Sequence, residues 1–153
     1  MRARAYSAIL FVLLATAFAG ARADELLMAR VNRPFPEAMA RLQDSIVAHG
    51  YTISHIQRVD LGLKANGYKT AEYRVVFFGK PKEMRELPAE YAPITAYLPL
   101  QIVIYAEGDD TIILAADPHE LASFFPQPAL QPHFATWERD FRAIFNEMRK
   151  GGE

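Results

Sequence analysis

Cysteine is absent from all 153 positions of the sequence. A chain without cysteine has no disulfide framework, no thiolate nucleophile and no thiolate metal ligand, so its stability must come from a packed core. Its four histidines, which are His49, His55, His119 and His133, show no paired spacing such as His-x-x-x-His. The sequence therefore predicts neither a metal site nor a cofactor.

An excess of positive charge is also lacking. The chain has 17 lysines and arginines against 18 aspartates and glutamates, and the basic residues are scattered among the acidic ones. Domains that bind nucleic acid usually carry a strongly basic face that contacts the phosphates. The sequence therefore predicts no nucleic-acid partner.

No apolar run is long enough to cross a membrane. The run at Ala8–Ala19 has about a dozen residues, whereas a membrane-spanning helix needs roughly 20. It follows two arginines, at positions 2 and 4, and precedes a small-x-small triplet at 21–23. This is the three-part pattern of a secretory signal peptide, so we expect residues 1–23 to be cleaved off. The mature chain would then be periplasmic or secreted, with no stable membrane insertion.

The mature residues 24–153 show no internal repeat and no linker that would divide them, so they predict one domain. Its expected strands are Leu26–Val31, Tyr51–Val59, Glu72–Phe78, Leu100–Glu107 and Thr111–Ala116. The last two are separated by a short link of glycine and aspartate, which is a strong hairpin signal. Consecutive apolar residues at Val75–Phe78 favour a central strand that is covered on both faces.

Helical spacing of apolar residues is found in two long segments. In Pro36–His49 the stripe contains Met39, Leu42 and Ile46, and in His133–Lys150 five apolar residues recur at intervals of three and four. A short helix is expected after Asp117, and the stretch at 60–70, with two glycines and an asparagine, is expected to be a loop or a broken turn.

These elements predict an α+β domain in which helices pack on a largely antiparallel sheet of about five strands. The long amphipathic C-terminal helix has two interpretations. It packs on the sheet through its aromatic stripe, or it presents that stripe to a partner.

Three segments follow one another in a recognisable order: "FPEAMARLQDSIVAHGYTI", "YRVVFFGKP" and "LPLQIVIYAEGDDTIILAADP". The order resembles the domain of unknown function 302 family over roughly Phe35 to Pro118. The resemblance implies a compact α+β domain, often dimeric, with no established activity to carry over. Family members often have asparagine-proline where this chain has Gly79-Lys80-Pro81, so a role of that asparagine is not transferred.

The segment Gly79–Pro99 is the candidate binding site, because it is long and rich in proline for a connection between strands. It forms either a lid over a site or a pair of helical turns that cover the sheet edge. We expect Tyr91 and Tyr97 to line a gap there. Lys80 and Lys82 would stand at its rim and favour a small acidic ligand. The Gly-Lys pair is not a nucleotide loop, since no glycine and no hydroxyl residue stand where that motif needs them.

His55 is the histidine with the most chemical interest, because strand alternation places it on one face with Tyr51, Ile53 and Val59. It is either a hydrogen-bonded structural residue or a catalytic one. Three functions stay open. We favour a non-catalytic domain that binds a small ligand or partner, over a small hydrolase or isomerase built around His55 and over a purely structural homodimer.

Overall fold

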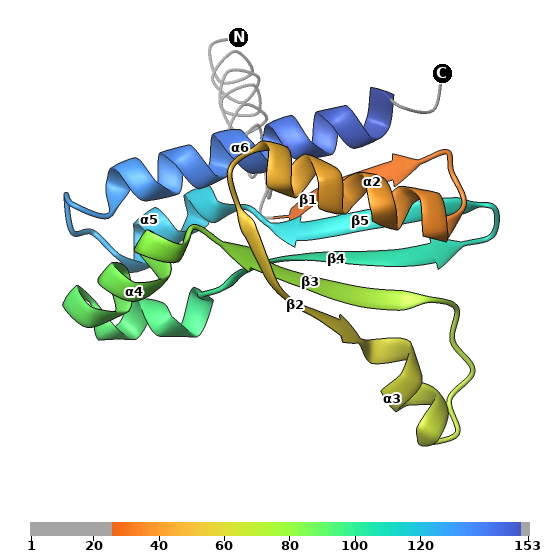
Figure 1. Ribbon diagram of the computed structural model, residues 1–153. Coiled ribbons are helices and arrows are strands. Elements are labelled where there is room, and N and C mark those ends of the chain that lie inside the picture. Colours follow the sequence, from red (N-terminus) through yellow and green to blue (C-terminus); the bar gives the residue numbers. More distant parts are fainter. Residues whose placement is uncertain (1–25, 151–153) are drawn as a thin grey trace, which may run out of the picture.

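The computed structural model describes residues 26–150, and its centre is one five-stranded antiparallel sheet (Figure 1). The predicted signal peptide lies outside the described residues. The strands are β1 (Leu26–Val31), β2 (Thr52–Arg58), β3 (Tyr73–Gly79), β4 (Leu100–Glu107) and β5 (Asp110–Ala116). They are arranged in the order β1-β5-β4-β3-β2, and each neighbouring pair is antiparallel. The predicted strands and the β4–β5 hairpin are confirmed.

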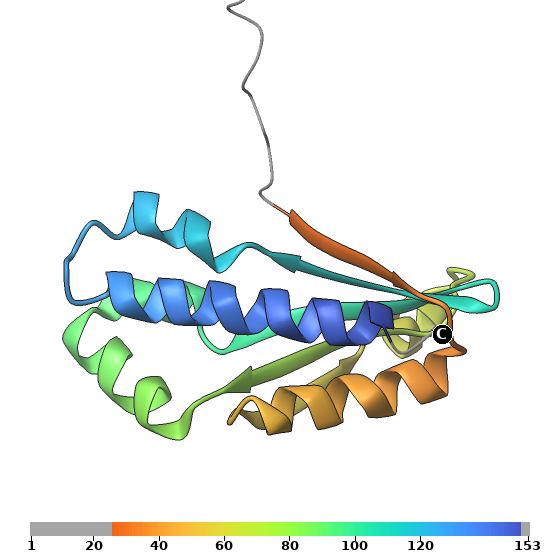
Figure 2. The same ribbon diagram turned by 90° about the horizontal axis from the view of Figure 1, so that it is seen from above.

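Two long helices cover one face of this sheet. Helices α2 (Phe35–Ala48) and α6 (Gln131–Lys150) lie side by side above the strands in both views (Figures 1 and 2). The remaining helices are α3 (Val59–Ala65), α4 (Pro81–Glu90), η2 (Ala92–Tyr97), η3 (Pro118–Glu120) and α5 (Leu121–Phe124). The predicted α+β class and the long C-terminal helix are confirmed.

The hydrophobic core lies between this pair of helices and the sheet. The aromatic stripe of α6 packs inward, and Trp137 and Ile144 are completely buried. They meet the side chains that the strands direct upward, among them Val76, Phe78 and Ile102. The interpretation in which the stripe packs on the sheet is therefore correct, and α6 does not present it to a partner.

Helix α3 corrects the expected loop at 60–70. Its Val59 and Leu63 lie four residues apart and are half-buried, and its one fully buried residue is Asp60, which forms an ion pair with Arg74 of β3. The helix ends where the Asn66 Nδ2 donates to the Gly62 carbonyl at 2.8 Å and Gly67 adopts a φ of +84°. Apolar periodicity is recognised over a window of roughly 11–18 residues, and this helix has only 7.

A bulge in β2 corrects the face assigned to His55. The pairing with β3 shifts between Ile53, which lies opposite Phe78, and His55, which lies opposite Phe77. The extra residue, Ser54, moves every later side chain to the other face of the strand. The prediction that His55 shares a face with Tyr51 and Ile53 is therefore wrong.

β3 is an interior strand, as predicted, but it is not covered on both faces. It lies between β2 and β4. Its Val76 and Phe78 are buried under the helices, whereas Val75 and Phe77 on the opposite face are only half-buried. None of the described helices lies over the middle of that face (Figure 1). The expectation of cover on both faces is wrong for residues 26–150.

Candidate functional site

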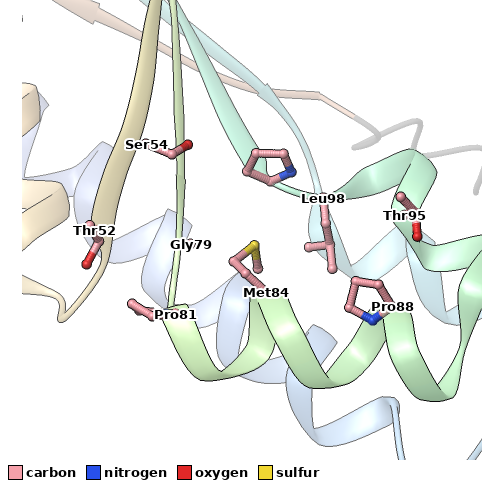
Figure 3. Close-up of a pocket in the computed structure, with 9 residues that line it drawn as sticks. Thr52, Ser54, Gly79, Pro81, Met84, Pro88, Thr95 and Leu98 are labelled. Atoms are coloured by element: carbon pink, nitrogen blue, oxygen red, sulfur yellow. The ribbon is translucent and has the colours of Figure 1, made fainter.

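The segment Gly79–Pro99 forms two helices rather than an irregular loop. Helix α4 begins at Pro81 and continues through Pro88, and the 3-10 helix η2 follows directly after Tyr91. Together with the adjacent ends of β2 and β3 they border an open cavity of about 490 Å³ (Figure 3), which we call the α4 cavity. It is lined by Thr52, Ser54, Gly79, Pro81, Met84, Pro88, Thr95, Leu98 and Pro99.

The lining of the α4 cavity is mostly apolar, and none of its nine residues carries a charge. Hydroxyl groups come from Thr52, Ser54 and Thr95, and the Ser54 hydroxyl donates to the Phe77 carbonyl at 3.2 Å. Such a surface suits an apolar ligand that makes a few hydrogen bonds.

Met84 and Gly79 shape the wall of the α4 cavity. Figure 3 shows the Met84 side chain reaching from α4 into the space between the strands and Leu98. A Cβ atom on Gly79 would lie 2.5 Å from the Met84 sulfur, so the absence of a side chain there makes room for the thioether. Methionine is unbranched and polarizable, which lets this wall adapt to the shape of a ligand.

The two lysines predicted at the rim do not line the α4 cavity. The Lys80 Nζ lies 3.5 Å from the Asp140 Oδ2 and 4.7 Å from the centre of the Tyr51 ring. Lys82 is exposed, and its Nζ lies 3.9 Å from the Glu86 Oε2.

The two tyrosines line different cavities. Tyr91 borders a cavity of about 430 Å³ between α4 and the start of α6. Tyr97 borders one of about 300 Å³, in which its ring stacks 6.4 Å from that of Phe124. The structure therefore brings each tyrosine to a gap but does not bring both to the same one.

His55 lies outside these three cavities. Its Nε2 is 3.1 Å from the Gln57 amide oxygen, and its ring stacks 6.1 Å from the Phe77 ring on an exposed part of β2. No carboxylate or hydroxyl is placed to form a catalytic pair with it among the contacts of the described residues.

A buried polar cluster joins three parts of the chain that sequence patterns did not connect. The Tyr51 hydroxyl donates to the Asp140 Oδ2 at 2.8 Å, and Arg139 donates to the Asp140 Oδ1 at 3.0 Å. Burial and the bond to this carboxylate raise the pKa of Tyr51. Burial by itself raises the pKa of Asp140, but the bonds from Tyr51 and Arg139 and the charge of Lys80 outweigh it and hold that pKa below its usual value. One sequence signal could have pointed to Asp140. It is a charged residue three positions after Trp137, so it lies on the same inward face of the helix.

A second polar contact ties α4 to α6. The Trp137 indole donates to the Glu83 Oε2 at 2.9 Å, and the His133 Nδ1 lies 3.2 Å from the Glu83 Oε1. These contacts and the Lys80–Asp140 pair hold the wall of the α4 cavity against the core. They position the site and do not line it.

Comparison with known proteins identifies the family. The family described as "Domain of unknown function DUF302" matches residues 28–148. The chain belongs to the DUF302 family. Its DUF302 domain is similar to the crystal structure of an uncharacterized conserved protein DUF302 from Bacillus stearothermophilus, with a TM-score of 0.73 and 23% identity. That similarity covers 83% of this chain and 100% of the other, and it shows a shared fold. No curated protein matches the chain.

The described part of the DUF302 domain contains neither a membrane-spanning helix nor a cluster of metal ligands. Within residues 26–150, no helix combines the length and the apolar composition needed to cross a bilayer. The same residues contain no group of three histidine, aspartate or glutamate side chains that is arranged to hold a metal ion. The family match and the similar crystal structure confirm the resemblance that the sequence predicted, for both the family and the fold.

Proposed function

We propose that this DUF302 protein is an exported, non-catalytic domain that binds a small ligand in the α4 cavity. The observation that carries the proposal is a cavity of about 490 Å³ with an apolar lining and three hydroxyl groups. Small-molecule sites are typically concave, roughly 300–1,000 Å³ in volume, and mostly apolar with a few polar groups. The leader pattern at residues 1–23 supports export.

The lining favours a ligand with an apolar body and one or two hydrogen-bonding groups. Thr52 and Ser54 on β2 face Thr95 on η2 across the apolar wall formed by Met84 and Leu98 (Figure 3). A small acidic ligand, which Lys80 and Lys82 favour, stays a prediction. The lining of the α4 cavity carries no charge, and Lys82 borders the separate cavity of about 430 Å³ together with Tyr91.

The contacts of His55 favour binding over catalysis. A hydrolase or isomerase built on this residue needs a carboxylate or hydroxyl partner in a pocket. His55 instead lies beside the Gln57 amide and outside the α4 cavity. The proposed function therefore assigns it no chemical role.

The experiment replaces Thr52 with phenylalanine, which fills the α4 cavity from an exposed strand position where aromatic residues are well accepted. The matched control is His55→Phe on the same strand, outside the cavity. Two fluorescent apolar probes report binding: the anionic anilinonaphthalene sulfonate and the uncharged Nile red. Mass spectrometry identifies small molecules that the purified protein retains.

We expect Thr52→Phe to weaken probe binding by at least about tenfold, while His55→Phe binds like the wild type. Thermal unfolding midpoints of both variants should stay close to that of the wild type. Equal binding by Thr52→Phe and the wild type would place the ligand elsewhere. A preference for the anionic probe that disappears in the Lys80→Gln/Lys82→Gln double variant would support an acidic ligand.

A further inference from the structure

The cavity that Tyr97 borders differs in its chemistry from the α4 cavity, and we call it the Tyr97 cavity. Its volume is about 300 Å³, and it is lined by residues of η2, η3 and α5 and by the adjacent ends of β3, β4 and β5. The α4 cavity has no charged residue in its lining, whereas this cavity has two, and both are acidic. The lining contains four aromatic rings, from Phe77, Tyr97, Phe124 and Phe141, and two carboxylates, from Asp117 and Glu120.

Two of the aromatic rings stand at the solvent-exposed rim of the Tyr97 cavity. Tyr97 is 42% exposed and Phe124 is 65% exposed, and their ring planes stack at an angle of 24°. The buried ring of Phe125 supports this pair, because it meets the Tyr97 ring edge-on at 5.5 Å. The exposed rings are therefore held in place, and a ligand that covers them would remove apolar surface from water.

Glu120 supplies a negative charge beside these rings. It precedes Phe124 by four positions, a spacing that places two side chains on the same side of a helical segment, and both residues line the cavity. The other carboxylate of the lining, Asp117, is buried and pairs with Arg142 at 2.5 Å. Among the ion pairs of residues 26–150, none includes the Glu120 carboxylate. The charge of Asp117 is thus balanced within the fold, whereas that of Glu120 faces the cavity without a cation.

Basic side chains near η3 do not line the Tyr97 cavity. The Arg142 Nε lies 2.9 Å from the Glu138 Oε1, and the His119 Nδ1 lies 3.3 Å from the Glu138 Oε2. Neither Arg142 nor His119 belongs to the lining. The lining therefore combines aromatic rings with an unbalanced negative charge, and this combination selects for a cation over an anion.

We propose that the Tyr97 cavity binds the ammonium group of a small organic cation whose nitrogen carries methyl substituents, as in choline. Such a group is attracted to aromatic rings and covers them from water at the same time, and Glu120 supplies the opposite charge. A primary ammonium is strongly hydrated and would cover the rings less well. A volume of about 300 Å³ suits a ligand of this small size. The site shares only Leu98 and Pro99 with the α4 cavity, so it does not depend on the function proposed for that cavity.

The test titrates the purified protein with choline and, separately, with dimethylbutanol, the uncharged analogue in which a carbon atom replaces the nitrogen. Nuclear magnetic resonance shifts of the ligand methyl groups report binding. We expect choline to bind at least about tenfold more tightly than dimethylbutanol, because only choline carries the charge.

Two substitutions at exposed positions test the two parts of the site. Phe124→Leu removes the ring but keeps an apolar side chain, and Glu120→Gln removes the charge but keeps the shape. Each should weaken choline binding by at least about threefold, and Glu120→Gln should also reduce its dependence on salt. The matched controls are Tyr68→Leu, at an equally exposed aromatic residue, and Glu90→Gln, at an exposed glutamate. Both residues lie outside the Tyr97 cavity, so these variants should bind choline like the wild type.

Circular dichroism shows which variants are folded, and Glu120→Gln decides alone if Phe124→Leu does not fold. A wild type that binds no choline, or that binds dimethylbutanol equally well, would overturn the proposal. So would folded variants at Glu120 and Phe124 that bind choline as tightly as the wild type. Thr52→Phe, which fills the α4 cavity, should bind choline normally, and a loss of choline binding in this variant would place the cation in the α4 cavity instead.

Discussion

Asp140 is the residue whose burial has the clearest consequence for stability. Its carboxylate accepts from Tyr51 at the start of β2 and from Arg139, and it lies close to Lys80 at the start of α4. The hydrogen bonds and positive charges keep its pKa below the ordinary value despite burial. A buried charge that is paired in this way stabilises the fold only while it is ionised.

Stability should therefore depend on pH through Asp140. In the unfolded chain the carboxyl binds a proton near about pH 3.9, and in the folded chain it does so only at lower pH. The contribution of Asp140 is thus present above about pH 4 and is lost as the pH falls through the lower native pKa. We expect Asp140→Asn to reduce the free energy of unfolding most near neutral pH, with a smaller difference from the wild type near about pH 3. Urea unfolding at both pH values measures this.

The control for this prediction is Asp44→Asn on the exposed surface of α2, which should follow the wild type at both pH values. A difference between Asp140→Asn and the wild type that stays constant with pH would show that the carboxylate charge is not what stabilises the cluster.

At the scale of elements, α3 has one fully buried side chain, and that side chain is charged. Asp60 is its one buried residue, and the partner Arg74 is also buried and lies 5.4 Å above the ring of Phe35. Elements held by few apolar contacts open locally more easily than the core. The Asp60–Arg74 pair therefore links the attachment of α3 to the interior of the sheet.

Asp60→Ala should cost about 3–5 kcal/mol in the free energy of unfolding, because it removes the buried carboxylate and leaves the Arg74 guanidinium only the Tyr73 carbonyl at 3.1 Å and the exposed Glu72 carboxylate at 3.9 Å. The double variant Asp60→Ala/Arg74→Met should recover part of that loss, since it removes both charges. Urea unfolding compares the three proteins, and hydrogen exchange of α3 amides reports its detachment. If the single and double variants were equally unstable, the unpaired charge would not be the cause.

At the scale of the whole molecule, α2 and α6 cover one face of the sheet, and no described helix lies over the middle of the opposite face (Figure 1). The α4 cavity lies at one end of the sheet and is bounded by β2 and by η2.

Export would determine the N-terminus of the protein. If residues 1–23 act as a signal peptide, the protein recovered from outside the cytoplasm should begin at Asp24. N-terminal sequencing of the exported protein measures this directly. Recovery of the exported protein with Met1 still present would show that the leader is not cleaved.

The sequence by itself determined the types of most elements. β1 and β4 have the predicted bounds, and the aromatic stripe of α6 is buried as its spacing indicates. Turn chemistry located the β4–β5 hairpin, where Gly108 has a φ of +64°. These features depend on neighbouring residues, so local periodicity and turn residues are enough to encode them.

Tertiary structure alone decided the contents of the sites. Asp140 meets Tyr51 across 89 positions, and the α4 cavity joins Thr52 of β2 to Leu98 after η2. The bulge at Ser54 separated His55 from the face that strict alternation assigns to it. Such arrangements depend on which distant segments pack together and on the register in which their strands pair. A local sequence pattern specifies neither the partner nor the register, because each segment keeps its own periodicity whatever its neighbours are.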